Sequence, residues 1–296
     1  VGHTDLTLFA NEYLNVFTTG FHYAFAVAIF AMLISLVVYL INKNKFPDPA
    51  NKKVVAENGE AVAEMDIKEV KQRLYALFAV FAVVIFFWFS FHQNGLTLTY
   101  FAKDYTDLSQ IKINLGFSTL QGVEIFQSIN PFFVVFLTPI IVGFFGWLRA
   151  KGKEPSTPRK IVIGMGIAAL AYAVMALGSM GLPLKSEVDA MGGLTNEARV
   201  TPWLLIGTYF ILTVAELFIS PLGISFVSKV APPKYQGIMQ GAWLGATAVG
   251  NSLLFIGAIF YTTFSMITTW VLFVVACLIS MFTMLAMVKW LEKIAK

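Results

Sequence analysis

The stretch Pro202–Val227, PWLLIGTYFILTVAELFISPLGISFV, contains 26 residues and one formally charged side chain, Glu216. A helix of this length rises about 39 Å, at roughly 1.5 Å per residue, which is enough to cross a hydrocarbon core of about 30 Å. The stretch does not alternate between apolar and polar residues, as the strands of a membrane barrel do. It therefore predicts a transmembrane helix with some tilt.

The rest of the chain repeats this pattern. Of its 296 residues, 57% are hydrophobic and 13% are charged, about half the charged fraction of a typical soluble domain. The mean hydropathy is +0.73. Six further apolar runs extend over approximately 21–41, 74–93, 130–148, 161–182, 238–264 and 267–288. The sequence thus predicts an all-α integral membrane protein with about seven transmembrane helices.

The basic residues predict how these helices are oriented. The connections 43–73, 149–160 and 229–234, together with the C-terminus, contain 17 Lys and Arg, whereas the connections on the other side contain four. Basic loops stay in the cytoplasm. The C-terminus is therefore expected in the cytoplasm and residues 1–20 outside, in the inner or plasma membrane of a cell. The net charge of +4 follows from this rule and indicates no nucleic-acid partner.

The segment 43–73 is a polar linker that divides the chain. One expected helix, 21–42, precedes it, and six expected helices in 74–296 follow it. Six consecutive helices are the size of one half of a major-facilitator transporter. The chain begins Val-Gly-His-Thr without a signal-peptide pattern. We therefore expect a fragment, in which 21–42 is the last helix of a half that lies mostly upstream.

Glu216 is the only formally charged residue within the seven runs. A carboxylate in the middle of a span costs about 2.5–3.5 kcal/mol on insertion scales, and such groups usually mark a substrate or ion path. The alternative is a structural hydrogen bond to a neighbouring helix. Ser220 lies one turn later on the same face of the helix, so it is a second candidate for a polar site.

A polar and aromatic stripe follows one face of the run 238–264 and the residues before it. Its members are Gln236, Gln240, Trp243, Thr247 and Asn251, spaced by three or four residues. Such a stripe is expected on the wall of a cavity. Hydrogen bonding between helices, worth about 0.6 kcal/mol per contact, is the alternative interpretation.

The run 74–93 ends in a second polar group. Trp88 and His92 are four residues apart and share a face, and Gln93 follows as a cavity-lining candidate. His92 is a proton-coupling candidate because an imidazole changes its charge near neutral pH. A neutral hydrogen-bonding histidine near the interface is the alternative. No P-loop, metal-ligand pattern, cysteine pair or nucleophile motif is present, so no enzyme, catalytic residue, cofactor or metal is expected.

Four stretches resemble the proton-dependent oligopeptide transporter (POT) family of the major facilitator superfamily. They are Phe87–Gly95 (FWFSFHQNG), Phe126–Pro131 (FQSINP), Ala215–Gly223 (AELFISPLG) and Ala231–Trp243 (APPKYQGIMQGAW). They occur in the family's order, on its seventh, eighth, tenth and eleventh helices. The resemblance extends from the family's sixth helix to its twelfth and implies a major-facilitator fold that carries di- and tripeptides with protons.

The resemblance also implies roles for particular residues. Asn130 and Glu216 match two positions that contact the peptide in members of the family. The resemblance implies that Glu216 contacts the α-ammonium group of the peptide. Ser220, Trp243 and Trp88 match positions that line the same pocket. His92 departs from the family, which usually has an acidic residue there. The implied partners are peptides, protons, the bilayer and the missing N-terminal half. Two alternatives remain open: a related transporter of nitrate or a drug, and a seven-helix receptor or assembly subunit.

Overall fold

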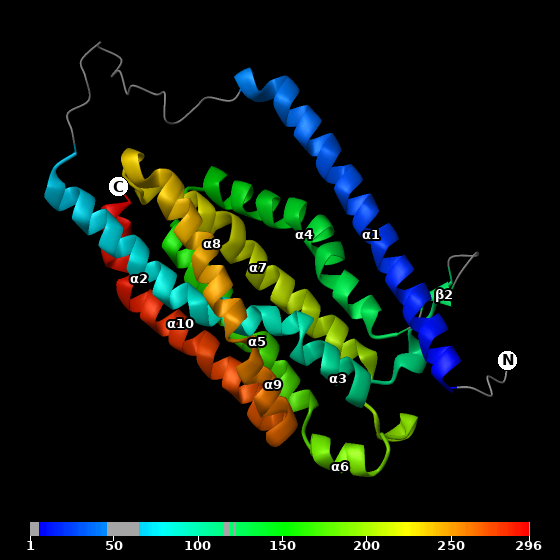
Figure 1. The fold of residues 1–296 in the computed structure, drawn as a ribbon. Coiled ribbons are helices and arrows are strands. Elements are labelled where there is room, and N and C mark those ends of the chain that lie inside the picture. Colours follow the sequence, from blue (N-terminus) through cyan, green and yellow to red (C-terminus); the bar gives the residue numbers. More distant parts are fainter. Residues whose placement is uncertain (1–5, 46–64, 115–118, 121, 296) are drawn as a thin grey trace. The chain divides into compact units, whose positions relative to one another are not determined.

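The computed structural model describes residues 6–45, 65–114, 119–120 and 122–295 (Figure 1). The helices are α1 (Leu6–Asn42), α2 (Ile67–Phe91), α3 (Thr97–Tyr105), α4 (Glu124–Ala150), α5 (Thr157–Gly178), α6 (Lys185–Ala190), α7 (Pro202–Val230), α8 (Gln236–Ser252), α9 (Leu254–Thr263) and α10 (Met266–Ile294). Two strands of two residues each, β1 (Ile113–Asn114) and β2 (Thr119–Leu120), pair antiparallel. Two compact units result: α1 belongs to residues 1–63, and the other helices belong to residues 64–296.

Seven helical segments of the described chain are long and apolar enough to cross a membrane. They are α1, α2 with α3, α4, α5, α7, α8 with α9, and α10. This confirms the predicted fold class, one helix followed by six. The protein is a multi-pass membrane protein.

Helix α1 begins at Leu6, so it starts within the expected external segment 1–20 and not near residue 21 as predicted. The reason is a row of aromatic rings at every fourth position, which is the repeat of one helical face. Neighbouring rings in this row have centroids 4.7–6.4 Å apart. The row consists of Phe9, Tyr13, Phe17, Phe21 and Phe25. It carries the helix without a break from the polar residues into the apolar run.

Helix α2 begins inside the expected linker 43–73. Asp66 caps its first turn by accepting a hydrogen bond from the backbone N–H of Lys68 at 3.4 Å. Glu69 and Arg73, four residues apart, form an ion pair at 2.8 Å. These local interactions make 67–73 the first two turns of the spanning helix, while residues 46–64 lie outside the described part of the chain.

Two of the spans are broken. A 3-10 turn at His92–Gly95 separates α2 from α3, and Leu253 separates α8 from α9. The sequence predicts the runs 74–93 and 238–264 each as one unbroken helix, and it does not predict α3. Broken helices in membrane bundles are tolerated where neighbouring side chains satisfy the freed backbone groups.

The core of the larger unit forms around α5, which packs against α7 on one side and α10 on the other. Gly164 makes the first contact close, since a Cβ there would lie 3.0 Å from the carbonyl oxygen of Ala215. Small residues at helix contacts let backbones approach in membranes. Helix α2 packs against α10 and α8, and α4 packs against α7. The α4–α7 and α2–α8 contacts position the polar groups described next.

Candidate functional site

Glu216 lies at the middle of α7 and is half-buried. Its Oε2 accepts a hydrogen bond from Asn130 Nδ2 of α4 at 3.0 Å. The same amide nitrogen also donates to Thr213 Oγ1 at 3.0 Å. Each of its two hydrogens therefore makes one hydrogen bond. Thr213 in turn donates to the carbonyl oxygen of Tyr209 at 2.7 Å. The structure thus brings together the two residues that the family resemblance had placed at a peptide.

No cation of the described chain neutralises Glu216. Its hydrogen-bond partner is a neutral amide, and none of the ion pairs formed by the described residues includes it. A carboxylate has about four lone-pair positions and accepts further bonds. This arrangement suits a cationic group that comes from outside this part of the chain. Ser220 is half-buried one turn further along α7.

Trp243 is almost completely buried, with 2% of its surface exposed. Its ring lies over Gly223 of α7, where a Cβ would clash with the indole. The ring of Trp243 also packs against the ring of Phe81 of α2, with ring centroids 6.3 Å apart. Trp243 therefore joins α8 to α7 and α2 in this conformation.

The stripe on α8 makes hydrogen bonds between helices, which was the alternative interpretation of its sequence pattern. Gln240 Nε2 donates to Ser228 Oγ at 2.6 Å and to the carbonyl oxygen of Ile224 at 3.2 Å, both on α7. Gln236 Nε2 donates to the carbonyl oxygen of Ser228 at 3.0 Å. Thr247 donates to its own helix, at the carbonyl of Trp243. The polar stripe holds α8 against the second half of α7.

Trp88 at the end of α2 and His92 in the 3-10 turn that follows form a stacked pair, with ring centroids 4.9 Å apart and planes 20° from parallel. Gly250 of α8 lies against the base of Trp88, where a Cβ would be 2.8 Å from Trp88 Cβ. Trp88 Nε1 and His92 Nδ1 are both buried, and neither has a hydrogen-bond partner among the described residues. An unpaired buried polar group costs about 1–3 kcal/mol. The pair is therefore a second place where an external partner is favoured.

Gln93 has a different environment from its neighbour His92. It is fully buried, its Oε1 accepts from Thr97 Oγ1 at 2.5 Å, and its Nε2 donates to the carbonyl oxygen of Leu254 at 3.3 Å. The carboxamide lies over Gly257, where a Cβ would clash with it at 2.5 Å. Gln93 thus connects the two helix breaks instead of facing an open space.

Sequence reasoning missed two residues that hold the turn at His92–Gly95. Tyr209 of α7 donates its hydroxyl to the carbonyl oxygen of Asn94 at 2.6 Å. Gln127 of α4 donates to the carbonyl oxygen of Gly95 at 3.3 Å and to Thr99 Oγ1 at 2.9 Å. The available signal was helical spacing, because Tyr209 lies about two turns before Glu216 and Gln127 about one turn before Asn130.

A family model described as the POT family matches residues 50–275. The chain belongs to the POT family. The peptide transporter YePEPT of Yersinia enterocolitica is 33% identical over 191 residues, which are 64% of this chain and 34% of that protein. A dipeptide and tripeptide permease B of Shigella dysenteriae is 31% identical over 174 residues, or 59% of this chain and 32% of the permease.

The fold has counterparts among solved structures. A crystal structure of a peptide transporter POT in complex with sulfate superposes with a TM-score of 0.64 at 22% identity, covering 94% of this chain and 54% of that one. The POT chain thus spans about a third to a half of the length of the relatives it matches. The predicted family and fold are confirmed.

Proposed function

We propose that this POT-family chain is part of a transporter that moves di- and tripeptides together with protons across the cell membrane by alternating access. Membership of the family supports the proposal, as do relatives named peptide transporter and dipeptide and tripeptide permease. The half built from α2 to α10 would rock against a second half, with substrate near the midplane between them. Transport of this kind needs no chemical step, so we infer no catalysis. The count of basic residues supports a cytoplasmic C-terminus.

The observation that carries the proposal is the Glu216–Asn130 pair. A peptide's α-ammonium group is the cation that the uncompensated carboxylate of Glu216 would bind, with Asn130 holding the carboxylate in position from α4. Charge-assisted hydrogen bonds of this kind contribute about 1.5–3 kcal/mol. Ser220, on the same face of α7, and the side chains of Trp88 and Trp243 complete the proposed substrate site.

We further propose that His92 couples transport to protons. It occupies a helix position where the resemblance leads one to expect an acid, it is stacked on Trp88, and its Nδ1 has no partner in the described part of the chain. An imidazole in such a place can gain a proton on one side of the membrane and lose it on the other.

The experiment that tests the Glu216 proposal crosses a protein variant with a ligand variant. Glu216→Gln keeps the shape of the side chain and removes its charge, so it is expected to weaken the binding of dialanine to the full-length transporter by about 10- to 150-fold. N-acetyl-dialanine lacks the ammonium group. It is expected to bind the unaltered protein poorly and to lose little more on the substitution. Competition binding measures all four combinations.

A matched control is Glu124→Gln, which removes an exposed acid at the start of α4. Its binding of dialanine is expected to stay within about twofold of the unaltered protein, as for a surface charge screened by water. Equal losses for the free and the acetylated peptide in Glu216→Gln would overturn the proposed role. Strong binding of solutes without an amino group would favour the alternative substrates of the family.

A further inference from the structure

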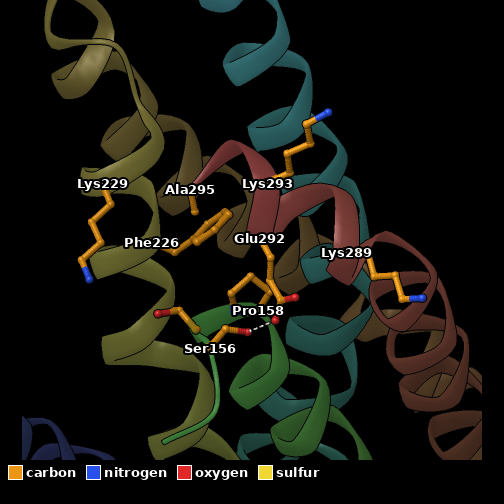
Figure 2. Close-up of a pocket in the computed structure, with 9 residues that line it drawn as sticks. Ser156, Pro158, Phe226, Lys229, Lys289, Glu292, Lys293 and Ala295 are labelled. Carbon is orange, nitrogen blue, oxygen red and sulfur yellow. Dashed lines mark hydrogen bonds between the residues drawn. The ribbon is translucent and has the colours of Figure 1, made fainter. Parts of the chain in front are cut away.

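A cavity of about 600 Å³ lies at the end of the bundle that the basic loops predict to face the cytoplasm. The start of α5, with Ser156 and Pro158, forms its floor, and Phe226 of α7 gives it an apolar wall. Figure 2 shows Lys229 of α7 on one side of the cavity, and Lys289 and Lys293 of α10 on the other. Three helices therefore contribute to one basic cavity, and none of its lining residues is among those proposed to bind peptide.

The acid in this cavity is already compensated. Glu292 accepts from Ser156 Oγ at 2.5 Å and pairs with Arg159 Nε at 2.7 Å. By contrast, the described part of the chain offers no ion-pair partner to Lys229, Lys289 or Lys293. The cavity is thus bordered by three exposed lysines without an ion-pair partner, whose ammonium groups point away from one another in Figure 2. Their flexible four-carbon stems allow these groups to turn toward an anion.

Two other basic residues at this end of the bundle share an acid. Arg149 and Lys160 both bind Glu154, at 2.6 Å and 2.5 Å. The hydrogen bonds from Arg149 and then Lys160 lower the pKa of Glu154 to about 2. In contrast to Arg149 and Lys160, the three lysines of the cavity form no ion pair with any described residue.

We propose that this cavity binds a phosphate-bearing anion, which in a bilayer is the headgroup of an anionic phospholipid. Basic pockets between transmembrane helices at the cytoplasmic side suit such headgroups. The ends of α7 and α10 and the start of α5 are ends of candidate membrane spans on the predicted cytoplasmic side, where lipid phosphates are expected. A bound headgroup would link α5, α7 and α10 through one shared anion.

The test uses the full-length transporter in neutral detergent and measures lipid binding by native mass spectrometry. Dioleoylphosphatidylglycerol is the anionic probe and dioleoylphosphatidylcholine the zwitterionic one. The triple variant Lys229→Gln, Lys289→Gln, Lys293→Gln is expected to bind phosphatidylglycerol at least about tenfold more weakly, because each lysine near a lipid surface contributes about a fivefold effect. The corresponding triple Lys→Arg variant keeps the charge and should keep the binding.

The matched control removes three exposed lysines from the same predicted side, by Lys43→Gln, Lys68→Gln and Lys71→Gln. It is expected to bind phosphatidylglycerol within about twofold of the unaltered protein. Equal losses in the two Gln triples, or equal binding of the two lipids by the unaltered protein, would overturn the site. If the triple does not fold, Lys289→Gln alone should show about a fivefold loss, and no loss there would overturn the site as well.

A second arm distinguishes the two sources of the anion. Sodium phosphate is added in place of lipid, at an ionic strength matched with sodium chloride, and the melting temperature is measured, since a ligand that binds the folded state raises it. A rise in the unaltered protein that is lost in the Gln triple assigns the same lysines to free phosphate. A response to phosphatidylglycerol alone assigns them to the lipid headgroup, and a response to neither overturns the proposal.

Discussion

At the scale of single residues, the polar atoms inside the bundle differ in whether the chain itself satisfies them. Gln93 forms hydrogen bonds with both the oxygen and the nitrogen of its carboxamide. Asn130 donates one amide hydrogen to Glu216 and the other to Thr213. Trp88 Nε1 and His92 Nδ1 are buried without a partner in the described residues. Because an unpaired buried group is costly, we infer that the first group holds helices together and the second is available to water, substrate or a proton.

The substitution His92→Gln tests this inference. Glutamine keeps a hydrogen-bonding side chain but cannot carry a proton's charge at any ordinary pH. Uptake of dialanine driven by an imposed proton gradient is therefore expected to fall at least about tenfold, while counterflow without a gradient stays within about twofold. Both are measured with the full-length transporter in proteoliposomes.

His22 provides the matched control, because it is an exposed histidine on α1. His22→Gln is expected to leave both rates unchanged. If gradient-driven uptake by His92→Gln keeps its normal rate and its normal dependence on pH, His92 is a structural residue, and the proton must bind elsewhere.

The sequence predicted part of this site. Glu216 could be found from the hydropathy pattern alone, since it is the single charged residue within seven apolar runs. Its partner Asn130 could not, because an amide in a membrane helix is unremarkable without the resemblance or the fold. Tyr209 was missed for another reason: its hydroxyl binds a carbonyl oxygen that is free only because the helix breaks at His92–Gly95, and the break was not predicted.

At the scale of elements, the break between α2 and α3 is joined to the candidate site by hydrogen bonds. Asn130 bonds both Glu216 and Thr213, and Thr213 bonds the backbone of Tyr209. The hydroxyl of Tyr209 then reaches the carbonyl oxygen of Asn94 in the break. A change at the carboxylate therefore has a continuous path to the point where the helix can bend. Two discrete arrangements of that break would make the path functional.

Tyr209→Phe removes one bond from this path and leaves the ring in place. The carbonyl of Asn94 loses its α7 partner, so opening of the turn at His92–Gly95 is expected to become easier by about 0.5–1.5 kcal/mol. Hydrogen exchange of the amides in 92–100 should then accelerate by about 2- to 10-fold. Tyr75→Phe, at an exposed tyrosine of α2, is the control and should leave this exchange unchanged. Equal exchange in the two variants would show that Tyr209 does not hold the turn.

Element lengths explain which parts of the fold the sequence predicted. Each span was recognised because crossing a bilayer needs about 20 apolar residues, whatever their neighbours. Hydropathy shows neither break as an interruption of a helix: the break at Leu253 lies inside a run that remains apolar, and the break at His92–Gly95 lies where the run 74–93 ends, so the continuation into α3 is missed. They are stabilised by contacts from distant residues, such as Gln93 to Leu254. The early starts of α1 and α2 arose from local interactions that a hydropathy window does not count.

At the scale of the whole molecule, the distribution of basic residues predicts which end of the bundle faces the cytoplasm. The α4–α5 turn, which includes Lys153, comes directly before α5, and Asp189 on α6 follows it. Helix α5 has 22 residues and so rises about 33 Å, close to the thickness of a hydrocarbon core. Positions 153 and 189 should therefore lie on opposite sides of the membrane.

Single cysteines at these two positions test the orientation in the full-length protein. Lys153 is preferred to its neighbour Gly152, whose φ of +66° disfavours a side chain. Cys277, which is fully buried, and any cysteine in the rest of the full-length protein are replaced by alanine, so that only the introduced thiol reacts. A membrane-impermeant maleimide added to intact cells is expected to label Asp189→Cys, and Lys153→Cys only after the membrane is opened. Labelling of both from outside would contradict the seven-helix topology. Labelling of Lys153→Cys alone from outside would keep the bundle but reverse its orientation, and it would move the lysine cavity to the outer surface.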